Sequence, residues 1–301
     1  MSVKSAMACQ KKYFIHAGGH RTGSSSVQMC LHQNRARITQ AGFDAAYPGR
    51  DDIPSGELGL RLPSPRHGET LNERFSKRVA EATTSLGPDP NRPLILSEEN
   101  IPGLMLHFFN GEFYPSAEAR MRALAEGLNG RLKRVLLIVR SYEELYISAH
   151  RKRAEDNYVM HFDEMRPALM SMNRGWPALV RAMRDVLQAE ETVVVAMSAR
   201  GDNRNVLRHL VPELEDNKLV EPQAVLNVSA TDAALEVLRA RYKAGEKLER
   251  PEWQQVILEH ADETEHRGFA EFSAAESKQL TDLYNRDLVR LSRIKRITFF
   301  R

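Results

Sequence analysis

Residues 13–28 read YFIHAGGHRTGSSSVQ, which is a short apolar run, then a loop rich in glycine and hydroxyl side chains, then the start of a helical pattern. Gly18 and Gly23 allow backbone angles and close approaches that other residues resist. Ser24–Ser26 supply hydroxyl groups, and the first turn of the following helix offers N–H groups without intrahelical partners. The stretch therefore predicts a strand, an anion-binding loop and a helix in succession.

The spacing of the two glycines matches that of a P-loop, but the positively charged residue lies at a different position in the loop. Ser24 occupies the position at which nucleotide triphosphatases carry lysine, while Arg21 lies inside the loop. Arginine keeps the charge and can donate two N–H groups to phosphate, although it is bulkier and does not readily release a proton. A tight turn with a helix cap is the alternative interpretation. The residues that we expect to hold the anion are Gly18, Gly19, Arg21, Thr22, Gly23, Ser24, Ser25 and Ser26.

Composition indicates an ordinary globular protein. The 301 residues include 43 Lys and Arg against 40 Asp and Glu, and this net charge of +3 is too small to indicate bulk binding to nucleic acid or a membrane surface. Cys9 and Cys30 are too few for a disulfide framework or a zinc site. With no signal-peptide pattern in Met1–Lys12 and no run of about twenty apolar residues, we expect a cytoplasmic protein.

Apolar runs alternate with helical patterns along the chain, which predicts an α/β fold: a three-layer sandwich with a mostly parallel sheet flanked by helices. A surface loop is expected over Pro48–Arg66. From about Thr231 the chain reads as a helical carboxyl-terminal cap on a single domain of residues 1–301. Strands are expected at Tyr13–Ala17, Phe43–Tyr47, Leu94–Ser97, Arg134–Val139 and Thr192–Met197. Helices are expected at Ser24–Gln40, Leu71–Thr84, Ala117–Leu128, Tyr142–Arg153, Trp176–Ala189, Ala233–Tyr242, Glu252–His260 and Ala274–Ile294.

Polar residues follow two of the expected strands. Glu98 and Glu99 come after Leu94–Ser97, and Arg140 comes directly after Arg134–Val139. Ligands of parallel sheets collect beyond the carboxyl ends of the strands. We therefore expect these side chains to meet the loop at one edge of the sheet, although a glutamate in such a place can equally cap a helix or pair with a cation.

In these motifs the chain resembles bacterial sulfotransferases that use 3′-phosphoadenosine-5′-phosphosulfate (PAPS). The loop from His20 to Ser25 with Gln28 is similar to their phosphosulfate loop, apart from Arg21 in place of lysine. Ser148 follows Arg140 by eight residues, and the resemblance implies that this pair holds the 3′-phosphate of PAPS. Glu99 aligns with a family glutamate. The resemblance is loose over Pro48–Pro93 and after Asn157.

The resemblance implies transfer of a sulfuryl group from PAPS to a hydroxyl or amine of a small-molecule acceptor, with carbohydrate as one candidate and 3′,5′-bisphosphoadenosine as the product. Arg21 is expected to stabilise the leaving oxygen. Glu99 is the first candidate for the general base, Glu98 the second and His20 the third. No metal is expected, and the sequence does not predict an oligomeric state.

Two other functions are compatible with the loop. A magnesium-dependent P-loop kinase for small molecules would need a strand ending in aspartate, and no strong pattern of that kind is present in the sequence. A nucleotide-binding protein without catalysis is the second alternative, because Arg21 replaces the lysine of the active enzymes.

Overall fold

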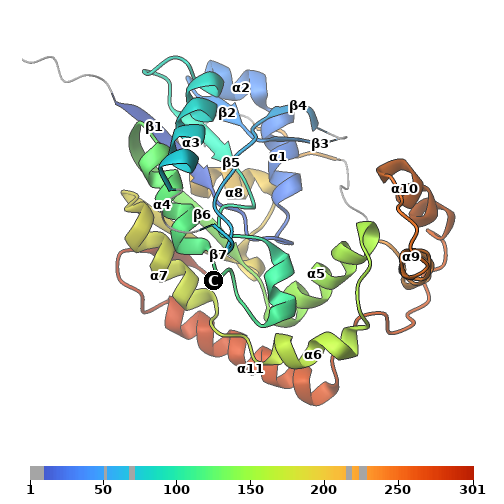
Figure 1. Ribbon diagram of the computed structural model, residues 1–301. Helices are drawn as coiled ribbons and strands as arrows, with labels where there is room; N and C mark the ends of the chain where they lie inside the picture. Colours follow the sequence, from blue (N-terminus) through green and yellow to red (C-terminus); the bar gives the residue numbers. More distant parts are fainter. Residues whose placement is uncertain (1–9, 51–52, 68–71, 215–218, 224–228) are drawn as a thin grey trace, which may run out of the picture.

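The computed structural model describes residues 10–50, 53–67, 72–214, 219–223 and 229–301. Over these residues the chain forms a central sheet of six strands in the order β2-β5-β1-β6-β7-β8, and all neighbouring pairs are parallel (Figure 1). This confirms the predicted α/β fold with a parallel sheet flanked by helices. The strands are β1 (Lys11–His16), β2 (Asp44–Ala46), β5 (Leu94–Ser97), β6 (Gly130–Val139), β7 (Glu191–Ala196) and β8 (Thr298–Phe300).

The strand order reverses at β1. Ile15 pairs with Leu96 of β5 on one side and with Val135 of β6 on the other. The chain leaves β1 for β2 and β5, then crosses back to β6, β7 and β8. The loop after β1 therefore lies at a topological switch point, where parallel sheets bind their ligands.

Alternating side chains of the strands pack into two apolar layers. Ile15 belongs to the layer beneath α3 (Asn72–Leu86), α4 (Ala117–Gly127) and α7 (Trp176–Leu187). Phe14, the preceding residue, belongs to the layer beneath α1 (Ser24–Gln33) and α8 (Asn203–Leu210). Because successive residues of a strand face opposite sides, nearly continuous apolar strands bury both faces of this sheet.

Two predictions near the amino terminus were wrong. The single helix expected at Ser24–Gln40 is broken at Asn34 into α1 and α2 (Arg35–Gln40), since the Asn34 amide donates to Cys30 O at 2.8 Å and accepts from Val220 N at 2.7 Å. The surface loop expected at Pro48–Arg66 contains an antiparallel hairpin of β3 (Pro48–Arg50) and β4 (Ile53–Glu57). Buried Ile53 anchors this hairpin against the α1 side of the sheet.

The carboxyl-terminal third has two parts. Helices α9 (Asp232–Lys243) and α10 (Arg250–Glu259) pack together beside α5 (Tyr142–Asp156), away from the sheet (Figure 1). In contrast, α11 (Ala274–Leu291) packs on α5 and α7, and β8 adds an edge strand to the sheet. The part of the chain after Thr231 therefore contributes to the main body, and the single domain of residues 1–301 with a helical carboxyl-terminal cap stays a prediction.

Besides the β3–β4 hairpin, the helices α6 (Phe162–Met170) and α8 and the strand β8 were not expected from the sequence. A 3₁₀ helix, η2 (Met105–Asn110), lies against α5 and α6 and carries part of the site described below. Every helix in the described ranges is too short or too polar to cross a bilayer.

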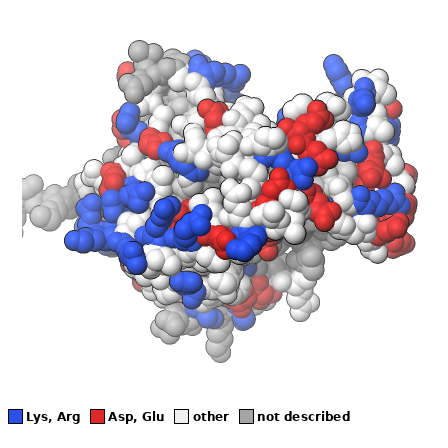
Figure 2. Space-filling model, turned by 90° about the horizontal axis from the view of Figure 1, so that it is seen from below, with Lys and Arg blue, Asp and Glu red and all other residues white. Residues whose placement is uncertain are grey.

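Charge is distributed unevenly on the surface. Figure 2 shows Lys and Arg side chains gathered on one side of the face seen from below, whereas acidic and basic side chains mix on the other side. The stretch 288–301 alone carries five Lys or Arg residues and no Asp or Glu. The small net charge thus hides local patches of one sign, and the expected lack of nucleic-acid or membrane partners stays a prediction.

Candidate functional site

The loop between β1 and α1 has an unusual backbone. Gly18, Gly19 and Gly23 have φ values of 72°, 88° and 86°, and Arg21 adopts the left-handed region as well, with φ 60°. A Cβ atom on Gly18 would lie 2.5 Å from Glu99 Cα, and one on Gly19 would lie 2.5 Å from Ile138 O. Glycine is required at both positions because the loop is wedged between the ends of β5 and β6.

Protein donors occupy four carbonyl oxygens of this loop. Their negative partial charge is thereby directed toward the protein, while the first turn of α1 keeps N–H groups that have no acceptor inside the helix. The loop is therefore suited to an anion, and the anion binding expected from the sequence stays a prediction. The pairs are Ile138 N to Gly18 O at 3.1 Å, Thr22 Oγ1 to Gly19 O at 2.5 Å, Arg140 Nη1 to Arg21 O at 2.7 Å and Arg200 Nε to Thr22 O at 3.2 Å.

Arg21, Arg140 and Ser148 meet, although they come from three separate parts of the chain. Arg21 Nε donates to Ser148 Oγ at 2.7 Å, and Arg140 holds the Arg21 carbonyl while its Nε donates to Glu144 Oε2 at 3.0 Å. Burial lowers the pKa of Arg21 from its ordinary value, and nearby Glu155 opposes this shift. The guanidinium stays cationic because arginine holds its proton so strongly.

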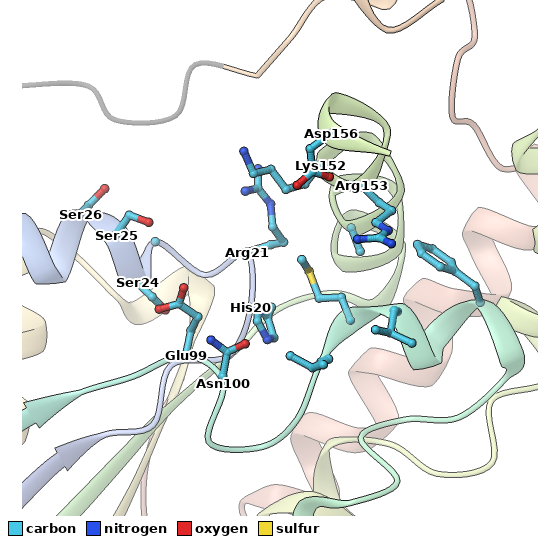
Figure 3. A pocket seen from close by; sticks show the side chains of 16 residues that line it. His20, Arg21, Ser24, Ser25, Ser26, Glu99, Asn100, Lys152, Arg153 and Asp156 are labelled. Atoms are coloured by element: carbon cyan, nitrogen blue, oxygen red, sulfur yellow. The ribbon is translucent and has the colours of Figure 1, made fainter. Parts of the chain in front are cut away.

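A cavity of about 450 Å³ opens beside the loop, bounded by the start of α1, the end of β5, η2 and α5 (Figure 3). Glu99 lines it and accepts a hydrogen bond from Gln28 Nε2 at 2.8 Å. The cavity thus brings together Arg21, His20, Glu99 and the serines at the start of α1. Its lining residues are His20, Arg21, Gly23, Ser24, Ser25, Ser26, Glu99, Asn100, Leu104, Met105, Leu106, Phe109, Ala149, Lys152, Arg153 and Asp156.

A smaller cavity of about 240 Å³ lies on the other side of Arg21. Arg140, Ser148 and Arg151 line it, together with Ser229 and Ala230 from the segment before α9. Arg151 is already engaged with the buried carboxylate of Asp232. Arg21 and Lys152 line both cavities, so the loop cation stands between them.

The two other candidate bases have different surroundings. Glu98 is buried at 4% exposure, is not among the cavity-lining residues, and accepts from Asn100 N at 2.9 Å and Asn100 Nδ2 at 2.8 Å. His20 lines the cavity, and its Nε2 lies 2.9 Å from Gly103 O. A carbonyl oxygen only accepts, so Nε2 carries the proton. Burial lowers the pKa of His20, while Glu99 opposes the shift.

Arg200 was missed from the sequence. It follows β7, its Nε donates to the Thr22 carbonyl, and a Cβ atom on Gly23 would lie 2.9 Å from its Nη2. Burial lowers the pKa of this guanidinium from its usual range, and Glu221 is the main opposing influence. Arg140 directly follows β6, whereas Arg200 is separated from the end of β7 by the short 3₁₀ helix Met197–Ala199, so its place after the strand did not mark it as a site residue.

Within the part of the chain that the structure describes, no group of three or more His, Cys, Asp or Glu side chains is placed to hold a metal ion. The expected lack of a metal stays a prediction.

Comparison with known proteins leaves the family open. No protein-family model matches the chain. No curated protein sequence matches it either. Among solved structures, the chain is similar to the crystal structure of a sulfotransferase from Alicyclobacillus acidocaldarius, with 15% sequence identity, a TM-score of 0.45 and 94% of both chains covered. A function for this chain therefore has to be inferred from the residues of the site.

Proposed function

We propose that the protein transfers a sulfuryl group from PAPS to a hydroxyl or amine of an acceptor. The observation that carries the proposal is the contact of Arg21 with Ser148, beside Arg140, at the switch point of the sheet. Three donors to phosphate oxygens thus gather around a loop whose backbone is itself arranged for an anion. Arginine and serine hydroxyl groups of this kind bind phosphate strongly, at roughly 1.5–3 kcal/mol for each charged contact.

The two cavities suggest how the donor lies. Arg140 and Ser148 would hold the 3′-phosphate in the smaller cavity, and the loop would hold the phosphosulfate at the mouth of the larger one. Arg21, which lines both cavities, would exchange its bond to Ser148 for contacts with the donor. Its charge would then offset the negative charge that develops on the leaving phosphate oxygen.

Glu99 is the preferred general base, since it lines the larger cavity whereas Glu98 does not. The acceptor oxygen forms the new bond to sulfur as the bond from sulfur to the phosphate oxygen breaks. The acceptor proton passes to the Glu99 carboxylate and then to solvent. His20 was the third candidate from the sequence, and we place it ahead of Glu98 because it lines the cavity; a neutral His20 with its proton on Nε2 keeps Nδ1 as a hydrogen-bond acceptor.

Calorimetric titration with 3′,5′-bisphosphoadenosine in the absence of magnesium tests the donor site. We expect binding that the double variant Arg140→Ala, Ser148→Ala weakens by about tenfold or more, given the loss of two phosphate contacts. Arg122→Gln on α4, an exposed arginine outside both cavities, is the matched control and should leave the affinity unchanged. Preference for ATP with magnesium would favour a P-loop kinase instead.

Turnover separates an enzyme from a binding protein. PAPS labelled in the sulfate group should be consumed in the presence of a mixture of hydroxylated acceptors. Glu99→Gln should lower the rate of this consumption by about a hundredfold. Tight binding of the bisphosphate without any consumption of PAPS would favour a non-catalytic nucleotide-binding protein.

A further inference from the structure

The larger cavity has two chemically different ends. His20, Glu99 and the serines of α1 form the end at which sulfuryl transfer is proposed. The wall that η2 and the residue before it supply is apolar, with the side chains of Leu104, Met105, Leu106 and Phe109. Leu106 is 41% exposed even though it is apolar. An uncovered apolar wall inside a cavity indicates a ligand with an apolar part.

Opposite this wall, α5 presents one face to the cavity. Ala149, Lys152, Arg153 and Asp156 line it, and their spacing places them on one side of a helix. Figure 3 shows that Arg153 lies at the α5 side of the cavity, across from Glu99 and the serines of α1. The cavity is therefore polar at one end, apolar along the η2 wall and charged at the α5 end, where Arg153 and Lys152 lie on the same helix face as Asp156.

Arg153 differs from the other cations of the cavity. Arg21 donates to Ser148, and Lys152 is paired with the Glu155 carboxylate. Arg153 is exposed, and its guanidinium has no hydrogen bond or ion pair with any of the described residues. Its guanidinium is free to receive an anionic group from a ligand that already covers the apolar wall.

We infer that the acceptor is an amphiphile, with a hydroxyl at one end, an apolar body, and a carboxylate or other anionic group at the far end. This inference rests on the proposed function. The apolar body packs between η2 and α5, the anionic group pairs with Arg153, and the hydroxyl lies beside Glu99. The transfer breaks the acceptor O–H bond and the bond from sulfur to the phosphate oxygen of PAPS, forms a new bond from the acceptor oxygen to sulfur and releases the bisphosphate, with the proton passing to Glu99.

A carbohydrate acceptor fits this cavity less well. Sugar rings carry hydroxyl groups around their edge, and those that face Leu104, Met105 and Leu106 would lose water without gaining a hydrogen bond. Each such group lowers the affinity by roughly five- to a hundredfold. An alkyl or aromatic body instead gains free energy from the same wall, in proportion to the apolar area that it covers.

Calorimetry with a series of ω-hydroxy fatty acids tests the inference on protein saturated with 3′,5′-bisphosphoadenosine. From ω-hydroxyhexanoate to ω-hydroxydecanoate, affinity should rise by up to about fourfold for each added methylene group. Leu106→Gln should flatten this rise. Arg153→Gln should lower the affinity for ω-hydroxydecanoate by about fivefold at low salt and by less at high salt. The affinity for the neutral decanediol should not change. Arg122→Gln on α4 is again the matched control.

The outcomes separate this inference from the proposed function. Binding of the bisphosphate together with a flat chain-length series, or with tighter binding of cellobiose than of any alkyl acid, would overturn the amphiphile and leave the donor site standing. Failure to bind the bisphosphate, combined with the full chain-length and Arg153 effects, would support the amphiphile site and overturn sulfuryl transfer.

Discussion

Substituting Gly19 by alanine tests the contact that shapes the loop. Gly19 has φ 88°, and a Cβ atom there would lie 2.5 Å from the Ile138 carbonyl oxygen. The left-handed conformation costs a non-glycine residue about 1–2 kcal/mol, and forcing an extra carbon into a packed site costs about 1–3 kcal/mol more. We therefore expect Gly19→Ala to lower the free energy of unfolding by about 2–5 kcal/mol.

Gly42 provides a matched control. Its φ is also 88°, but a Cβ atom there would have no heavy atom within 4 Å. Gly42→Ala should therefore lower the free energy of unfolding only by the cost of the left-handed conformation, about 1–2 kcal/mol. Urea unfolding followed by tryptophan fluorescence measures both variants, and the affinity for 3′,5′-bisphosphoadenosine should fall in Gly19→Ala alone. Equal losses of stability in the two variants would refute the close packing of the loop on β6.

Two further predictions concern buried groups. Burial lowers the pKa of both His16 and His150 to about 4. In the unfolded state a histidine has a pKa near 6.5, so below that pH the unfolded state binds more protons than the native state. The free energy of unfolding should therefore fall as the pH is lowered from ~6.5 to ~4, by up to about 3 kcal/mol for each histidine. Urea unfolding across this pH range measures the loss of stability. If His150→Phe left the pH dependence of the free energy of unfolding unchanged, the prediction would be contradicted. Burial also raises the pKa of the Cys30 thiol to about 12, so iodoacetamide should leave Cys30 unmodified in the native protein and label it in urea, as mass spectrometry of its peptide will show.

The sequence predicted the core of the sheet well because its signals are local. The expected strand Leu94–Ser97 agrees with β5 at both ends, and the helices begun at Ala117, Tyr142, Trp176 and Ala274 begin at those residues. Apolar runs of this length, bounded by polar residues, depend little on tertiary context. The hairpin β3–β4 escaped prediction because its strands are rich in glycine and proline, which usually indicate loops.

Contacts across the fold explain what the sequence could not predict in the site. The loop and the pair Arg140 and Ser148 were expected at one edge, and the structure places them in contact. No periodicity shows, however, that Arg200 reaches the Thr22 carbonyl from 178 residues away. The separation of Glu98 from Glu99, one held by Asn100 and the other lining the cavity, likewise depends on which way each side chain turns at the end of β5.

The loop depends on contacts with distant parts of the chain, and this bears on how the protein folds. The carbonyl oxygens of Arg21 and Thr22 are held by Arg140 and Arg200, which lie 119 and 178 residues along the chain from their partners, and β1 itself lies between β5 and β6. Pairings so distant in sequence form slowly, because a large loop of chain must close before they stabilise anything. Anion binding should thus appear only when β6 and β7 have docked, so that the recovery of ligand affinity during refolding follows the completion of the sheet rather than the formation of helices.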